Sequence, residues 1–302
     1  MMFFSIIIVY MVIFNFFLYN KAMKKQRFIF LFVFILLVPS VFFANEFSAD
    51  EQAVMEKVTD FRWHLFCDED YKSVAKKCDD FKEYIDSFKI KLSLSEECFI
   101  SIENILTWEK YNALYEINPS DSELEDFLTA QYKKIRFYFK NHKKDVHNKW
   151  LYVTAGDILS SSLQYLPLTT AMNEGLTIKK YYDKALEIDS NFVFCLINIG
   201  QWYFHAPAVS GGGKKKAMNA FLKAESSATS DAEKFYAKLY LSQCYFDFDD
   251  KEKAAALLDE CESLLPETRI VKFYRLLNEN GFCYFEYPQN RKKIDLKLKK
   301  TN

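Results

Sequence analysis

Apolar residues recur every three or four positions through most of the chain, which is the spacing of one face of an α-helix. Between residues 45 and 139 this pattern predicts four helices. The clearest stripe belongs to the last of them and consists of Leu124, Phe127, Leu128, Tyr132, Ile135 and Phe139. Ser48 and Glu51 match a capping box, in which the two side chains satisfy free backbone N–H groups at a helix start. We therefore expect the first helix to begin at Ser48.

A second pattern repeats three times between residues 147 and 280. In each copy the first helix carries a small residue among large ones, and the second helix carries a large residue between smaller ones. The copies are Ala155, Gly156 and Leu159 with Ile178, Tyr182 and Ala185; Ile199, Gly200 and Tyr203 with Ala217, Phe221 and Ala224; and Leu241, Ser242 and Tyr245 with Ala254, Leu258 and Cys261. Small residues let two antiparallel helices approach closely, and large residues fill the grooves between adjacent pairs. The spacing thus predicts three helix pairs over residues 146–282.

With this spacing and a closing proline at Pro266, the segment resembles the tetratricopeptide repeat. The resemblance implies an all-α solenoid, in which stacked antiparallel helix pairs share a core and leave a concave surface for a ligand. In the first two copies the connection between the helices is overlong, at residues 166–175 and 206–213. Composition agrees with helices and short turns, since the chain of 302 residues has only 7 Gly and 6 Pro.

The regions on either side of the repeats differ from them. The charged segment 140–145 is the expected boundary between a divergent helical region, residues 45–145, and the repeats. Residues 283–302 form a basic tail, in which the lysines of 291–300 are expected to be frayed and solvated.

Residues 1–44 are expected to direct export. A basic group at 23–27, the apolar run from Phe28 to Phe43 and the small residue Ala44 match a secretory signal. Either translation begins at Met23 and the signal is removed, or residues 1–44 form two membrane spans around a basic turn. Both interpretations predict a periplasmic or cell-envelope location, and the second attaches the protein to the membrane through its N-terminus.

The candidate chemistry does not indicate an enzyme. The loop Ser210–Lys216 fails the phosphate-loop pattern, because no Ser or Thr follows the lysine, and its glycines are expected to serve a turn with positive φ. The four histidines have no metal-ligand spacing, and His142 and His147 are expected to be solvated. The seven cysteines are expected to be buried thiols. We therefore expect no catalytic residue, metal or cofactor, and the formal net charge of -1 gives no footprint for nucleic acid.

The residues expected to reach a ligand surface are aromatic ones on the first helices of the pairs. They are Trp150, Tyr152, Trp202, Tyr203 and His205. These residues predict a non-catalytic scaffold that binds a protein or peptide partner. The loop at 206–213 and the long connection before it also resemble the T-component of tripartite ATP-independent periplasmic (TRAP) transporters. That resemblance implies a periplasmic substrate-binding protein or a small ligand as partner, although the chain lacks the lipid-attachment cysteine of lipoprotein members.

Overall fold

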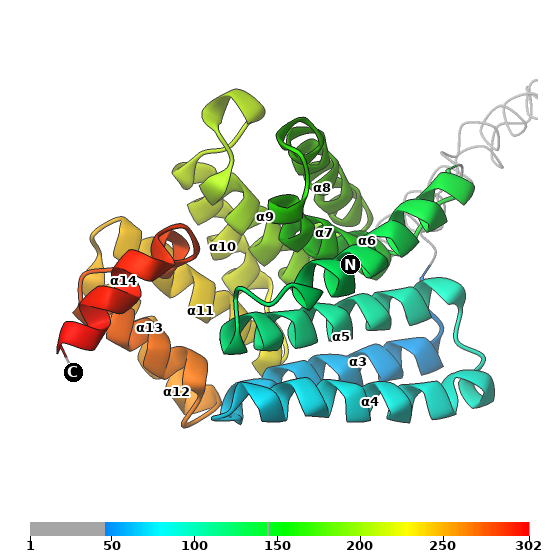
Figure 1. The fold of residues 1–302 in the computed structure, drawn as a ribbon, viewed down its shortest axis with the longest axis horizontal. Coiled ribbons are helices and arrows are strands. Elements are labelled where there is room, and N and C mark those ends of the chain that lie inside the picture. The colour runs from blue at the N-terminus through cyan, green and yellow to red at the C-terminus, as the bar shows by residue number, and fades with distance from the viewer. Residues whose placement is uncertain (1–45, 144, 302) are drawn as a thin grey trace, which may run out of the picture. The chain divides into compact units, whose positions relative to one another are not determined.

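The computed structural model describes residues 46–143 and 145–301, and these residues form helices and turns without any strand (Figure 1). The α-helices are α3 (Ala49–His64), α4 (Tyr71–Leu92), α5 (Glu96–Ile117), α6 (Glu123–Asn141), α7 (Lys149–Ser162), α8 (Leu168–Ile188), α9 (Val193–His205), α10 (Lys214–Ser227), α11 (Asp231–Asp247), α12 (Lys251–Leu264), α13 (Arg269–Glu279) and α14 (Tyr287–Thr301). Short 3₁₀ helices are η1 (Leu65–Cys67), η2 (Leu163–Tyr165), η3 (Ala208–Ser210) and η4 (Tyr284–Glu286). The all-α prediction is confirmed. The expected signal or anchor at 1–44 lies outside the described residues.

The capping box at the start of α3 is confirmed. The backbone N–H of Ser48 donates to Glu51 Oε2 at 2.8 Å, and the N–H of Glu51 donates to Ser48 Oγ at 3.3 Å. The other oxygen of Glu51 accepts from the N–H of Ser95 at 2.7 Å. One carboxylate therefore joins the start of α3 to the start of α5. None of the helices described here is long and apolar enough to cross a membrane.

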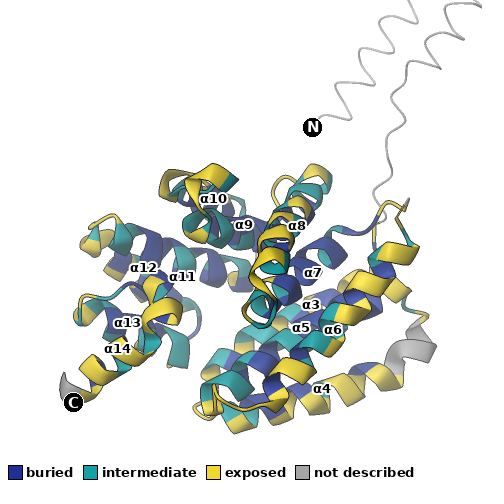
Figure 2. Ribbon diagram, turned by 45° about the horizontal axis from the view of Figure 1, so that its top comes forward, coloured by how far each residue is buried: buried dark blue, intermediate teal, exposed yellow. Residues whose placement is uncertain are grey.

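The three predicted helix pairs are present as α7 with α8, α9 with α10, and α11 with α12. At Gly156 an added Cβ would lie 2.4 Å from the ring of Tyr182, and at Gly200 it would lie 2.6 Å from the ring of Phe221. Each ring therefore occupies the space above a glycine of the partner helix, and the small residues allow the close approach that the spacing predicted. The paired helices turn their buried faces toward one another (Figure 2).

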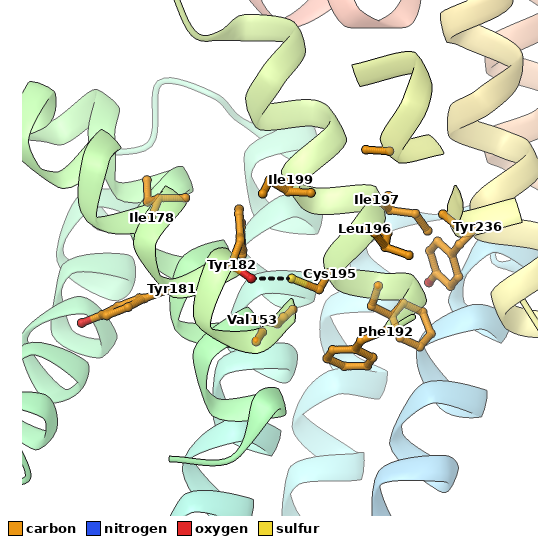
Figure 3. Close-up of a cluster of buried hydrophobic side chains, with 14 of the residues drawn as sticks. Val153, Ile178, Tyr181, Tyr182, Phe192, Cys195, Leu196, Ile197, Ile199 and Tyr236 are labelled. Carbon is orange, nitrogen blue, oxygen red and sulfur yellow. Dashed lines mark hydrogen bonds between the residues drawn. The ribbon is translucent and has the colours of Figure 1, made fainter. Parts of the chain in front are cut away.

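Adjacent pairs share one hydrophobic core. Figure 3 shows part of it, in which the thiol of Cys195 on α9 donates to the backbone carbonyl of Tyr182 on α8 at 3.3 Å. Tyr236 on α11 approaches the same cluster, with its ring centroid 5.7 Å from that of Phe194. All seven cysteines are free, and all except the exposed Cys67 are buried. The prediction of buried thiols thus holds for six of them.

The prediction of a frayed basic tail is wrong. Residues 287–301 form α14, in which Ile294 is 1% exposed and Leu298 is 7% exposed, and both pack with Leu277 of α13. Apolar residues between the lysines repeat at helical spacing, so one side of the helix is buried while the lysines stay in water. Arg291 of α14 also forms two hydrogen bonds with the carboxylate of Glu116 at the end of α5, at 2.9 and 2.6 Å.

His147, which was expected to be solvated, is buried. Its Nδ1 lies 2.7 Å from Glu97 Oε1 of α5, and its Nε2 lies 3.1 Å from the carbonyl oxygen of His142. The ring therefore joins α5 to the segment between α6 and α7. Both α5 and α6 pack against α7, so the helices before and after residues 140–145 belong to one compact unit.

The contact between Gly156 and Tyr182 can be tested by substitution. We expect Gly156→Ala to lower the free energy of unfolding by about 1–3 kcal/mol, because the new methyl group meets an aromatic ring that is fixed in the core. Gly175→Ala in α8 is the matched control, since no atom lies within 4 Å of its added Cβ. It should leave stability unchanged or raise it by up to about 1 kcal/mol through helix propensity. Urea unfolding measures the stability of both variants. Equal free energies of unfolding for Gly156→Ala and Gly175→Ala would contradict this packing.

Candidate functional site

The described residues form a groove of about 740 Å³ between α3 and the first turns of α7, α9 and α11. We call it the α3 groove. One wall is a side of α3 that includes the buried Met55 and the partly exposed Thr59 and Trp63. The opposite wall is formed by residues 148–150, 188–194 and 229–233, where three helices begin. Because the helix pairs repeat, their first helices start side by side and create this wall together.

The floor of the α3 groove is aromatic. The ring of Trp150 lies 4.7 Å from that of Phe192 and 5.5 Å from that of Phe194. Phe192 and Phe194 are buried, whereas Trp150 and Trp63 are partly accessible. A guest molecule would therefore reach mainly the rings of Trp150 and Trp63.

The rim of the α3 groove is acidic. Its lining contains one lysine, Lys149, and six carboxylates, namely Glu46, Glu56, Asp60, Asp189, Asp231 and Glu233. Burial opposes ionisation of Glu233, but hydrogen bonds from the backbone N–H groups of Thr229 and Ser230 outweigh it and lower the pKa. The groove thus carries a negative charge that the net charge of the whole chain does not reveal.

Lys149 shows how the α3 groove can hold a cation. Its Nζ lies 2.6 Å from Asp189 Oδ2 and 4.8 Å from the centroid of the Phe192 ring. Although burial of Asp189 opposes it, the hydrogen bond from Lys149 contributes to a lowered pKa of this carboxyl. An ammonium group above an aromatic face and beside a carboxylate is a favourable combination.

Only one of the five sequence-predicted site residues lines the α3 groove, and that residue is Trp150. Tyr152 is 7% exposed and packs against the rings of Phe139 and Tyr181, at 5.8 and 5.9 Å. The remaining three lie at the opposite end of α9 from Phe194. Because an α-helix rises about 1.5 Å per residue, roughly 12 Å of helix separates Trp202 from Phe194. The structure therefore does not gather the five residues into one site.

Trp202, Tyr203 and His205 lie next to the glycine loop. The indole N–H of Trp202 donates to the backbone carbonyl of Gly175 on α8 at 3.0 Å, and the ring of Tyr203 lies 5.6 Å from that of Trp202. His205 is exposed at the end of α9. Trp202 thus ties α9 to α8.

The loop itself folds back onto α9, because the N–H of Gly213 donates to the carbonyl of Tyr203 at 2.8 Å. Gly211 and Gly213 have φ of 93° and 155°, as expected for a turn that needs glycine. A Cβ on Gly212 would lie 1.9 Å from the carbonyl oxygen of Ala206, so the backbone passes too close there for any side chain. These contacts give the loop a structural role.

A buried polar cluster on the inner side of α7 escaped the sequence analysis. Arg62 at the end of α3 forms an ion pair with Glu109 of α5, and its guanidinium lies 4.8 Å from the Trp108 ring and 5.4 Å from the Tyr236 ring. Asp157 of α7 accepts hydrogen bonds from Tyr182 at 2.9 Å and from Asn198 at 2.6 Å. The one available signal was a charged residue within an apolar stretch, Gly156-Asp157-Ile158-Leu159.

Burial raises the pKa of Asp157 to about 6, although the nearby Arg62 guanidinium acts in the opposite direction. Within the described part of the chain, no three His, Cys, Asp or Glu side chains lie close enough together to hold a metal ion. The ion pair of Arg62 joins α3 to α5, and the hydrogen bonds of Asp157 join α7 to α8 and α9.

No protein-family model matches this chain, and no curated protein matches it.

The raised pKa of Asp157 predicts a pH dependence. The folded state binds the carboxyl proton of Asp157 more tightly than the unfolded state, in which this carboxyl has a pKa near 3.8. The wild type therefore loses stability as the pH rises from about 4 to about 6. We expect Asp157→Asn to gain stability relative to the wild type over this window, by at most about 3 kcal/mol. Urea unfolding at pH 4 and pH 8 measures this difference. Asp259→Asn, at a carboxylate whose side chain is 69% exposed, is the control and should show almost none.

Proposed function

We propose that this protein is a non-catalytic binding scaffold and that the α3 groove holds an extended, basic segment of a protein partner. The observation that carries the proposal is the combination of an aromatic floor with six carboxylates in one groove. The volume of about 740 Å³ is within the range of pockets that hold small ligands, and it suits a few peptide residues.

The chemistry of the groove favours lysine or arginine side chains in the guest. Lys149 already places its ammonium group over Phe192 and beside Asp189. A guest lysine near Trp150 or Trp63 could bind in the same manner, with Glu46 and Glu56 as partners. Both glutamates are exposed and have no ion pair among the described residues. Apolar side chains of the guest would rest on the aromatic floor between these charges.

The location and family of the protein belong to the same proposal. The basic and apolar pattern of residues 23–43 supports export to the periplasm or cell envelope. Three glycine- or serine-centred helix pairs support a relation to tetratricopeptide repeat scaffolds, which bind their partners without catalysis. A periplasmic substrate-binding protein is one partner to be tried, because of the weaker resemblance to TRAP T-components.

Peptide binding to the full chain tests the proposal. A ten-residue peptide that alternates lysine with leucine should bind by titration calorimetry, and a peptide with glutamate in place of lysine should not. Replacing Glu46 and Glu56 together by Gln should weaken binding about tenfold, or roughly 1.4 kcal/mol, because two exposed charges of the rim are lost. Added salt should weaken binding of the wild type more than that of this variant.

The matched control is Glu252→Gln on α12, an exposed glutamate that does not line the groove. It should leave the affinity unchanged. Equal affinity for the basic and the acidic peptide, or an equal effect of Glu252→Gln and of the paired substitution, would contradict a basic guest in the α3 groove.

A further inference from the structure

The end of α6 concentrates positive charge. Residues 133–145 contain six Lys or Arg, at 133, 134, 136, 140, 143 and 144, and a single carboxylate, Asp145. Lys133, Phe137 and Lys140 lie on the same side of the helix, because residues at i, i+4 and i+7 share a face. We call the group of Lys133, Arg136, Phe137, Lys140 and Lys143 the α6 basic end.

Most of this charge takes no part in holding the fold. Lys134 forms an ion pair with Glu103 of α5, and Arg136 lies 3.5 Å from Glu174 of α8. In the described ranges 46–143 and 145–301, Lys133, Lys140 and Lys143 have no ion pair. A lysine in the last turn of a helix stabilises the helix dipole, which accounts for Lys140. It does not account for Lys133, two turns earlier, or for the aromatic residue between them.

Phe137 is exposed in the middle of these cations. Its surface is 68% exposed, although most phenylalanines in a folded protein are largely covered. It borders a hollow of about 430 Å³, which is lined by Arg136, Phe137, Phe139, Lys140 and Lys143. The lining contains two aromatic rings and three cations and no carboxylate. Its chemistry is thus the opposite of that of the α3 groove.

The α6 basic end is near the point where the described chain begins. Tyr138 of α6 packs against His147, with ring centroids 5.8 Å apart. The next residues, Asn148 and Lys149, line the α3 groove together with Glu46 and Phe47. Phe47 and Trp150 belong to one hydrophobic cluster, so the first described residues lie near the start of α7, which follows the α6 basic end in the chain. In the sequence, the apolar run of residues 28–43 ends three positions before Glu46.

We propose that the α6 basic end binds an anionic lipid surface. Lysines attract negatively charged headgroups, and an exposed aromatic ring among them can enter the boundary between headgroups and acyl chains. The hollow accepts a phosphate-bearing headgroup between Arg136, Lys140 and Lys143. The apolar run that precedes the described residues in the sequence favours lipid over nucleic acid as the source of the negative charge. This contact is a second one, additional to any attachment through residues 1–44, and it does not depend on the α3 groove.

The test uses tryptophan fluorescence of the full chain with vesicles whose acyl chains are brominated, because bromine quenches tryptophan that enters the membrane boundary. Phe137→Trp is compared with Phe248→Trp, a second exposed phenylalanine, which is 43% exposed and lies at the end of α11. With phosphatidylglycerol vesicles the added tryptophan at 137 should lose at least half of its fluorescence, and the one at 248 should be unaffected. The parent chain supplies the signal of the native tryptophans for subtraction.

Two comparisons separate this contact from insertion of the N-terminal run. Quenching at 137 should be lost with phosphatidylcholine vesicles and when Lys133, Lys140 and Lys143 are all replaced by Gln, because each change removes charge attraction while residues 1–44 stay the same. Equal quenching at 137 and 248, equal quenching in both lipids, or a response to an oligonucleotide but not to vesicles would overturn the proposal. Peptide binding in the α3 groove is measured separately and is expected to survive the three substitutions.

Discussion

The fold depends on the contact between an aromatic ring and a glycine in the partner helix. Tyr182 lies over Gly156, and Phe221 lies over Gly200, at distances that leave no room for a Cβ. This contact sets how closely α7 approaches α8 and how closely α9 approaches α10. Since packed interiors tolerate little change in volume, the spacing of the pairs is fixed by these residues. The alignment of the first helices, and with it one wall of the α3 groove, follows from that spacing.

Long-range charged contacts then place the remaining helices around the pairs. Arg62 pairs with Glu109 and lies against rings of α5 and α11, so it fixes the end of α3. Arg269 of α13 lies 4.1 Å from the Tyr71 ring, and Arg291 of α14 is held by Glu116. Early and late parts of the chain are thereby joined. The α3 groove exists because α3 is held across the starts of α7, α9 and α11.

Charge is separated along the surface even though its sum is close to zero. The formal net charge is -1, yet the α3 groove has six carboxylates and one lysine, and the hollow at the end of α6 has three cations and no carboxylate. Surface charges more than about 10 Å apart are largely screened at physiological salt, so each patch acts on a partner by its own local charge. A net charge near zero therefore excludes neither a basic partner at the α3 groove nor an anionic partner at the end of α6.

The sequence by itself determined the helices and the manner of their pairing, because both depend on residues within a few turns of each other. The capping box at Ser48, the glycine turn at 211–213 and the small residues facing Tyr182 and Phe221 were all readable from local spacing. Only the tertiary structure decided which distant residues meet. It buried His147 against Glu97, covered one side of α14, brought Arg62 to Glu109, and separated Trp150 from Trp202. His147 and Glu97 are 50 positions apart in the sequence, and Arg62 and Glu109 are 47 apart. Helical periodicity indicates which side of a helix is apolar but not which helix will cover it.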